Sequence, residues 1–309
     1  MILGGTKAVG PAAARHLRER HTVAVAHSGA HEHPDVADLE HLHGPREQLL
    51  TKGGRIERWR PEVLVDTFAG GATAERASDL AAVATRAGSA HLITISSIDV
   101  YQHGVDCGMA DGSGSRELSR TPLPVVEDAP LRSAPYPGGS AAHDNVAAEG
   151  ALHGWGKVTA LRPGAIYGPH VGVRERTFVE LIARGVRALP LPDGGTQLFH
   201  RVATDRVGRA VAAAVDRAPA GFWACNVVDP YDWDYSGLAN EVGRLLDWHW
   251  EPTRVAFTAA DHPWQVTHPF LCSDRRLREI LCVEGPDPRD ALAECLEWLK
   301  NDVARTGAD

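Results

Sequence analysis

The chain opens with MILGGTKAVG (residues 1–10), in which a short apolar segment runs directly into a glycine-containing turn. A helix is expected next, and Pro11 suits its first turn because proline lacks an N–H group that would be unpaired there anyway. The free N–H groups and partial positive charge at a helix start stabilise a phosphate when the backbone can approach it closely. Gly4 and Gly10 permit that approach, and Lys7 replaces the middle glycine of the usual spacing with a side chain that can reach a phosphate. The stretch therefore predicts a strand, turn and helix that bind the diphosphate of a dinucleotide.

The first two-thirds of the chain alternates between apolar bursts and helical patterns. The bursts predict buried strands at residues 22–26, 63–67, 91–96 and 158–162, and the helical patterns predict helices at 11–20, 73–87 and 141–153. Such alternation is typical of an α/β fold, a doubly wound parallel sheet with helices on both faces. We therefore predict a Rossmann-like dinucleotide-binding domain over residues 1–168.

Beyond residue 168 the pattern loosens, and a smaller, mostly helical lobe is expected. Helices are predicted at 174–187, 206–217, 235–246, 274–281 and 290–303, with a loop at 190–195 and a strand at 222–228. We expect residues 169–309 to form a substrate-binding lobe, with the strand near 222–228 returning to the first domain. A stretch at 104–139, rich in Gly, Ser and Pro, is too long for a tight connection and predicts a surface loop or lid near the site.

Charge balance and cysteine pattern exclude several classes of protein. The 309 residues include 32 basic and 40 acidic side chains, a net charge of −8, with no dense Lys/Arg run that could follow a nucleic acid. The five cysteines are scattered and never form a CxxC pair, which argues against a disulfide framework and fits a cytoplasmic protein. No apolar run approaches the roughly 20 residues of a membrane span, and we expect no signal peptide. We expect a small-molecule substrate as partner, with a homodimer as the compatible assembly.

Histidines are numerous, with 16 in the chain. Closely spaced pairs such as His31/His33 and His41/His43 supply at most two ligands each, whereas metal sites usually need three or four convergent ligands. We therefore expect these histidines to be exposed surface residues and predict no metal.

The end of the second strand normally discriminates between NAD and NADP, because an acidic residue there accepts hydrogen bonds from the ribose hydroxyls. The segment here reads Val25-Ala26-His27-Ser28-Gly29 and has no carboxylate to repel a 2′-phosphate. With Lys7, His27 and Ser28 nearby, NADP(H) is favoured and NAD(H) is the alternative. The competing interpretation is that this end of the sheet binds no nucleotide and His27 is an exposed loop residue.

Several segments together resemble the extended short-chain dehydrogenase/reductase superfamily. They are GGTKAVG at 4–10, ISSIDVY at 95–101, LRPGAIYGP at 161–169 and VATD at 202–205, and they extend over nearly the whole chain. The resemblance is to the NAD(P)-dependent epimerase/dehydratase-like and atypical branches. It implies a Rossmann-like fold, a nicotinamide dinucleotide cofactor and oxidoreductase-type chemistry.

The resemblance also implies roles for individual residues. Ser97 stands at the position of the catalytic Ser/Thr that hydrogen-bonds a substrate oxygen, and Asp99 stands where sugar-nucleotide dehydratases carry an acid. The expected cofactor-binding residues are Gly4, Thr6, Lys7, Val9, Gly10, His27, Ser28, Phe68, Ala69, Ser96, Asn145, Pro163, Gly164 and Ile166. The alternative for Ser96 and Ser97 is that they end a strand through side-chain to backbone hydrogen bonds.

One segment departs from the resemblance where the family carries a Tyr-x-x-x-Lys pair. Alignment through Glu149 places Ala141 at the tyrosine position and Asn145 at the lysine position. That pair normally transfers a proton and holds the nicotinamide ribose, so a non-standard proton relay is required. His143 is a candidate catalytic residue because imidazole titrates near neutral pH, although on a helix it would point about 200° away from residue 141. Tyr136, in the preceding loop, is another candidate.

Three functions are compatible with these observations. The first is an NAD(P)-dependent oxidoreductase, epimerase or dehydratase acting on a small hydroxyl- or carbonyl-bearing metabolite, sugar-like or specialised. The second is a non-redox enzyme on the same fold, such as a cyclase, lyase or isomerase, which the loss of both proton-handling residues motivates. The third is a non-catalytic NADP-binding sensor. We favour the first because the resemblance is nearly full-length and the cofactor itself carries the hydride chemistry.

Overall fold

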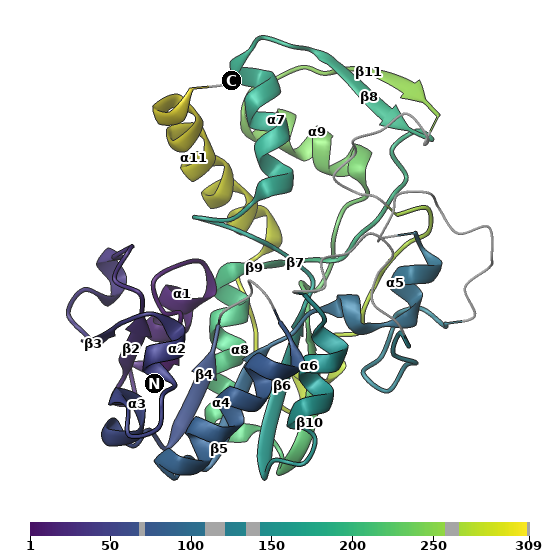
Figure 1. The fold of residues 1–309 in the computed structure, drawn as a ribbon. Coiled ribbons are helices and arrows are strands. Elements are labelled where there is room, and N and C mark those ends of the chain that lie inside the picture. The colour runs from purple at the N-terminus through teal and green to yellow at the C-terminus, as the bar shows by residue number, and fades with distance from the viewer. Residues whose placement is uncertain (68–71, 109–120, 134–142, 257–265, 308–309) are drawn as a thin grey trace.

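One parallel sheet forms the centre of the computed structural model, which describes residues 1–67, 72–108, 121–133, 143–256 and 266–307 (Figure 1). Its seven strands lie in the order β10-β6-β5-β4-β1-β2-β3, and every neighbouring pair is parallel. Their bounds are Ile2–Leu3 (β1), Ala24–His27 (β2), Glu40–His43 (β3), Val63–Asp66 (β4), His91–Ile95 (β5), Lys157–Pro163 (β6) and Gly221–Val227 (β10). The order runs outward from β1 in both directions, as in a doubly wound Rossmann-like sheet. The predicted fold class is confirmed.

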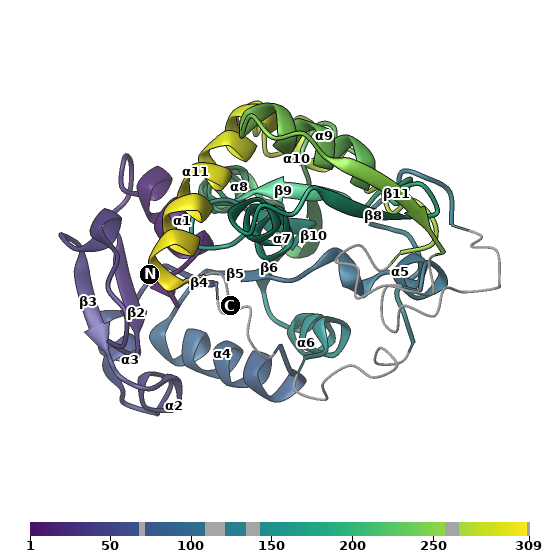
Figure 2. The ribbon, with the colours of Figure 1, turned by 90° about the horizontal axis from the view of Figure 1, so that it is seen from above.

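Helices cover both faces of the sheet (Figure 2). Helices α1 and α8 pack on one face, and α3, α4 and α6 pack on the other, each set closing a separate apolar core. Their bounds are Val9–Leu17 (α1), Arg55–Trp59 (α3), Ala74–Ala87 (α4), Asn145–Leu152 (α6) and Thr204–Arg217 (α8). Successive strand residues alternate between the faces, so Ile2 belongs to the first core and Leu3 to the second. Within the described ranges, no helix is both long and apolar enough to cross a membrane.

A second part of the molecule lies above the sheet in Figure 1. It contains three helices and two parallel strand pairs, β7 with β9 and β8 with β11. The bounds are Ala165–Tyr167 (β7), Val173–Ala183 (α7), Ala188–Pro192 (β8), Arg201–Ala203 (β9), Tyr235–Leu245 (α9), Glu251–Val255 (β11) and Pro288–Thr306 (α11). The chain returns to the sheet from this part, since α8 packs on α1 and β10 pairs with β6. The division into residues 1–168 and 169–309 stays a prediction.

Some elements differ from the sequence expectation. The segment 190–195, expected as a loop, begins with the last three residues of strand β8 and continues as a turn. Strand β8 tolerates two prolines because it belongs to a two-stranded pair. Strand β3 was not predicted, because its sequence EHLH contains a single apolar residue. The strand lies at the sheet edge, where it buries only that leucine. The stretch expected as a loop from residue 104 overlaps helix α5 (Gln102–Asp106), which follows the 3-10 helix η2 (Ile98–Val100). The remaining short helices are η1 (Pro34–Val36), α2 (Arg46–Leu49) and α10 (Arg275–Glu279).

The contact between α1 and α8 depends on a glycine. A Cβ atom added to Gly208 would lie 2.6 Å from the carbonyl carbon of Ala12 in α1, whereas one added to Gly150 in α6 would meet nothing within 4 Å. We expect Gly208→Ala to lower the free energy of unfolding by about 1–3 kcal/mol, because the two helices must separate. Gly150→Ala is the matched control and should raise it by up to about 1 kcal/mol. Urea denaturation of both variants measures the difference, and equal effects would refute the close packing.

Candidate active site

The glycine turn after β1 is packed so closely that side chains at its glycines would clash with neighbouring atoms. Gly4 has a φ of 88°, and a Cβ added to Gly5 would lie 2.5 Å from Cγ1 of Val25. A Cβ added to Gly10 would lie 2.6 Å from the Gly5 carbonyl carbon, so the turn and the helix touch through bare backbone. Helix α1 starts after Ala8 with no capping hydrogen bond from a side chain. Within its first turn, Gly10 donates its N–H to the Lys7 carbonyl oxygen at 3.0 Å and Pro11 has no N–H, so phosphate binding at this helix start stays a prediction.

A cavity of about 360 Å³ adjoins this turn, between the ends of β1, β2 and β4. It is lined by Leu3, Gly4, Thr6, Lys7, Ala8, Ala26, His27, Ser28, His31, Gly44, Arg46, Leu49 and Thr67. Among these lining residues, Lys7 and Arg46 are cationic and none is a carboxylate. Arg46 is held from outside by a bidentate ion pair with Asp66, at 3.1 and 2.8 Å. The shape and charge of this cavity fit the nucleotide half of a dinucleotide.

A second group of polar residues gathers beyond the carboxyl end of β5. Asn145 donates from Nδ2 to both carboxylate oxygens of Asp99, at 2.9 and 3.0 Å. Nε2 of His143 lies 3.4 Å from Oδ2 of Asp99 and 3.2 Å from the Asn145 amide nitrogen. The Asp99 side chain is 12% exposed and that of His143 is 41% exposed. The sequence-predicted residues Asp99, His143 and Asn145 thus form one cluster with its imidazole open to solvent.

The position of His143 corrects the geometric objection raised from the sequence. Helix α6 begins at Asn145, later than predicted, and His143 precedes it. Asp144 is the N-cap, accepting from the N–H groups of residues 146 and 147, and Arg132 holds it with an ion pair of 2.8 Å. Because His143 is not helical, the 200° rotation does not apply, and its ring can turn toward Asp99.

Asp99 changes the proton affinity of its neighbour. Its hydrogen bond and negative charge raise the pKa of the His143 imidazole above its ordinary value, against the opposing effect of partial burial. An imidazole with this kind of carboxylate partner can gain and lose a proton near neutral pH. The arrangement could therefore carry out general acid–base chemistry.

The two serines after β5 have partners within the protein. Oγ of Ser97 accepts a hydrogen bond from the Asp99 N–H at 3.1 Å and caps η2, which is the structural role weighed from the sequence. Oγ of Ser96 donates to Oε1 of Glu149 at 2.6 Å. A hydroxyl that accepts one backbone bond still has its own proton to donate, so the structure leaves the proposed substrate contact of Ser97 open.

A buried ion pair fixes the floor of this region. Arg162 of β6 donates to both oxygens of Glu149, at 2.6 and 3.0 Å, and to the Tyr101 hydroxyl at 3.0 Å. Tyr101 in turn donates to Oδ1 of Asn226 at 2.6 Å. Sequence reasoning did not single out this network, because its members come from segments far apart in the chain. It fastens α6, and with it the Asp99 cluster, to the sheet.

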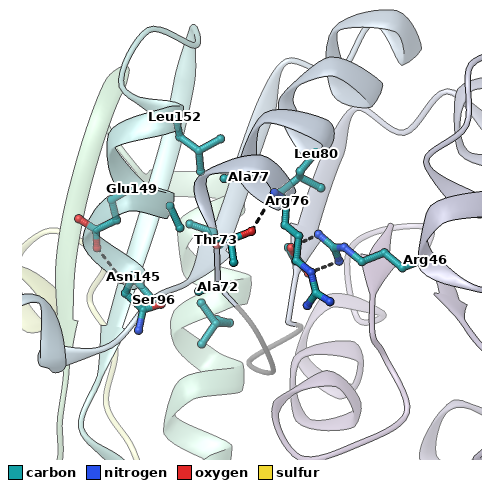
Figure 3. A pocket seen from close by; sticks show the side chains of 14 residues that line it. Arg46, Ala72, Thr73, Arg76, Ala77, Leu80, Ser96, Asn145, Glu149 and Leu152 are labelled. Carbon is teal, nitrogen blue, oxygen red and sulfur yellow. Dashed lines mark hydrogen bonds and ion pairs between the residues drawn. The ribbon is translucent and has the colours of Figure 1, made fainter. Parts of the chain in front are cut away.

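Figure 3 shows where Ser96, Asn145 and Glu149 line a small cavity between α4 and α6, opposite Thr73 and Arg76. The cavity holds about 30 Å³, enough for about two water molecules and too small for a substrate. We therefore assign it a structural role.

The other predicted site residues are distributed as follows. Thr6, Lys7 and Val9 belong to the turn and the start of α1; Pro163, Gly164 and Ile166 belong to β6, β7 and their connection. A Cβ added to Gly164 would lie 2.3 Å from the carbonyl oxygen of His200, so that connection passes unusually close to the residue that precedes β9. Ser28 is exposed after β2, whereas His27 is buried rather than an exposed loop residue. Tyr136, Phe68 and Ala69 lie outside the described residues, as does Ala141.

Comparisons with known proteins agree with this architecture. No protein-family model and no curated protein sequence matches the chain. Solved structures do, among them a UDP-glucose 4-epimerase from Thermotoga maritima, with 17% identity, a TM-score of 0.70 and 98% of each chain covered. A dTDP-glucose 4,6-dehydratase from Streptomyces venezuelae with NAD bound has 18% identity and a TM-score of 0.71, over 98% of this chain and 97% of that one. A UDP-N-acetylglucosamine 4-epimerase from Methanobrevibacter ruminantium has 14% identity and a TM-score of 0.72, over 97% of each chain.

The fold is that of sugar-nucleotide epimerases and dehydratases. The resemblance found in the sequence is confirmed at this level, and over nearly the full length of the chain. Identities below 20% leave the reaction and the substrate to be argued from the site itself.

Proposed function

We propose that the protein is an NAD(P)-dependent enzyme of the epimerase or dehydratase type that acts on a hydroxyl- or carbonyl-bearing metabolite, with a nucleotide sugar as the first class to test. The observation that carries this proposal is the Asp99, His143 and Asn145 cluster. It lies at the carboxyl edge of the same sheet whose glycine turn and cavity fit a dinucleotide. This edge is where open α/β sheets bind their ligands.

In this proposal His143 replaces the absent tyrosine as proton acceptor and donor. The Asp99 carboxylate accepts a hydrogen bond from the Nε2–H of His143 and orients the ring, which leaves Nδ1 to take a proton from a substrate hydroxyl. The resulting imidazolium is stabilised by the Asp99 carboxylate, as in other carboxylate–histidine pairs. Asn145 keeps Asp99 in place through two hydrogen bonds but carries no charge. Ser97 would donate its hydroxyl proton to a substrate oxygen.

A bound nicotinamide dinucleotide would supply the hydride acceptor or donor that this chemistry needs. The glycine turn and the start of α1 would hold its diphosphate, and the cavity beside Lys7, His27 and Arg46 would hold its adenosine half. Lys7 in the lining of that cavity supports a preference for NADP(H). Arg46 is already paired with Asp66, the Glu32 carboxylate lies 3.8 Å from Nε2 of His27, and the Streptomyces dehydratase was solved with NAD, so NAD(H) is the alternative.

Lys7 offers a test of the cofactor preference. Lys7→Gln should weaken NADPH binding by about tenfold, the equivalent of about 1.4 kcal/mol, because the 2′-phosphate of NADPH would lose a cationic partner. NADH binding should weaken less, since NADH lacks the 2′-phosphate. Lys300→Gln, at an exposed position on α11, is the matched control. Nucleotide fluorescence titration gives the dissociation constants, and equal losses for the two nucleotides would contradict the preference.

Turnover provides the test of the proposed function. The protein is incubated with UDP-glucose, UDP-glucuronic acid or dTDP-glucose, with and without added NAD⁺ or NADP⁺, and products are followed by NMR. Turnover that requires the nucleotide supports the proposal. Turnover that survives nucleotide removal would favour a non-redox enzyme, for which the uncharged Asn145 at the lysine position is the supporting observation. Nucleotide binding without any turnover would favour a sensor.

A further inference from the structure

Four potential metal ligands meet at the edge of the sheet, at the rim of the nucleotide cavity and apart from the Asp99 cluster. His27 ends β2, His41 and His43 lie two residues apart on β3, and Glu32 lies on the loop between those strands. The parallel register pairs His27 with His43, and residues two apart on a strand share a face. One nitrogen or oxygen from each of the four side chains lies within 4.8 Å of all the others.

The separations between donor atoms suit a small divalent ion. Four ligands about 2.1 Å from a zinc ion stand about 3.4 Å apart at the corners of a tetrahedron. Nε2 of His27 lies 2.9 Å from Nδ1 of His41, and Nδ1 of His41 lies 3.4 Å from a Glu32 oxygen. Nε2 of His43 lies 3.3 Å from Oε1 of Glu32, and Nε2 of His27 lies 3.8 Å from it. Small side-chain adjustments would bring all four atoms to a common centre.

Hydrogen bonds outside the cluster orient the two more enclosed ligands, His41 and His27. Nε2 of His41 donates to the carbonyl oxygen of Val36 at 2.8 Å. The ring proton of His41 is therefore on Nε2, and the lone pair of Nδ1 faces the cluster. His27 accepts at Nδ1 from the Gly29 N–H at 3.2 Å, so its proton lies on Nε2 in this arrangement. Coordination by His27 would move that proton to Nδ1 and end the Gly29 contact. That contact is at the long end of the hydrogen-bond range.

An ion could enter from solvent without unfolding the strands. The side chains of His27 and His41 are 4% and 14% exposed, whereas those of His43 and Glu32 are 51% and 52% exposed. Two ligands are thus preorganised by burial, and two can swing to close over the ion. An exposed half-site of this kind fits reversible binding.

We propose that His27, Glu32, His41 and His43 form a binding site for a divalent transition metal ion, with Zn²⁺ as the first ion to test. Imidazole nitrogens and one carboxylate suit zinc and its neighbours rather than magnesium or calcium, which prefer oxygen ligands. Four protein ligands would leave no open position on a tetrahedral ion, which favours a structural or regulatory site over a catalytic one. Because His27 also lines the cavity beside the glycine turn, an ion here would tie β2 and β3 together at its rim.

The test is a calorimetric titration of the full chain with Zn²⁺ after chelator treatment and dialysis, with no nucleotide present. We expect one equivalent to bind. The side chains of His43 and Glu32 are half-exposed, and His43→Ala and Glu32→Gln should each weaken the affinity for Zn²⁺ by at least about 10-fold, since loss of an outer-shell partner alone costs about 10- to 100-fold. Co²⁺ in place of Zn²⁺ should give the visible absorption bands of a tetrahedral site.

His31→Ala is the matched control, because His31 is exposed on the same loop but is not one of the four ligands. Its affinity and stoichiometry should equal those of the unaltered protein. Absence of a bound equivalent, or equal affinities for the His43→Ala and His31→Ala variants, would overturn the proposal. The readout is independent of cofactor and substrate, so its failure is separate from any failure of the proposed enzymatic function.

Discussion

His143→Gln should lower kcat by about 10²- to 10⁴-fold on whichever substrate supports turnover, the usual contribution of a general acid–base group. Glutamine keeps a polar side chain of similar reach but cannot exchange a proton near neutral pH. KM should change little, because the imidazole is proposed to transfer a proton in the transition state rather than to bind the substrate in the ground state. His249→Gln, at an exposed histidine after α9, is the matched control and should leave kcat unchanged.

The same histidine should set the pH dependence. As a general base it acts in the neutral form, so kcat/KM should rise with pH through the raised pKa of His143. Asp99→Asn removes the charge that raises this pKa, so the acid limb should move to lower pH. NMR titration of the His143 ring protons measures the shift directly and needs no substrate. An unchanged kcat in His143→Gln, or an unmoved titration in Asp99→Asn, would refute the assigned roles.

Arg201→Met should lower the free energy of unfolding by about 3–5 kcal/mol, the loss typical when one partner of a buried ion pair is removed. The Arg201 side chain is 1% exposed and pairs with Glu175 at 2.8 Å and with Asp232 at 2.6 Å. The side chains of Glu175, on α7, and Asp232 are 2% and 1% exposed, so removing the guanidinium leaves two buried carboxylates without the cation that they share. Chemical denaturation monitored by tryptophan fluorescence measures the effect.

Two variants define the cause of this loss. Arg305→Met removes a 77% exposed partner of Asp302 and should cost no more than about 1 kcal/mol, because solvent screens such pairs. The triple variant Arg201→Met, Glu175→Gln and Asp232→Asn removes all the charges together and should recover much of the stability lost in the single variant. If Arg201→Met lowered the free energy of unfolding by no more than Arg305→Met does, burial of this ion pair would not explain its contribution to stability.

Local patterns in the sequence were sufficient for the fold. The four strands predicted from apolar bursts correspond to β2, β4, β5 and β6 with boundaries within two residues, because buried parallel strands are continuous apolar runs. The glycine turn at residues 4–10 was also predicted, because the spacing of its glycines can be seen in neighbouring residues. Strand β3 was missed because an edge strand buries little, and β8 was missed because its prolines favour a loop.

The candidate site was predicted only in part. Asp99, His143 and Asn145 were named individually, but the sequence placed His143 on the wrong side of a helix whose first residue is in fact Asn145. Helix α6 begins where Asp144 caps it, and an ion pair with Arg132 holds Asp144 in place. Because that ion pair joins two separate segments, local sequence patterns do not show it.

By itself, the sequence determined a doubly wound sheet and a glycine turn after its first strand, and it showed that no tyrosine stands four residues before a lysine, because each of these follows from neighbouring residues and their spacing. Tertiary structure alone decided which distant side chains meet: Asp99 with His143, Arg201 with two carboxylates, and four ligands where β2 lies beside β3. These contacts depend on strand register and helix packing, and a shift of one residue in register would turn each strand side chain to the opposite face.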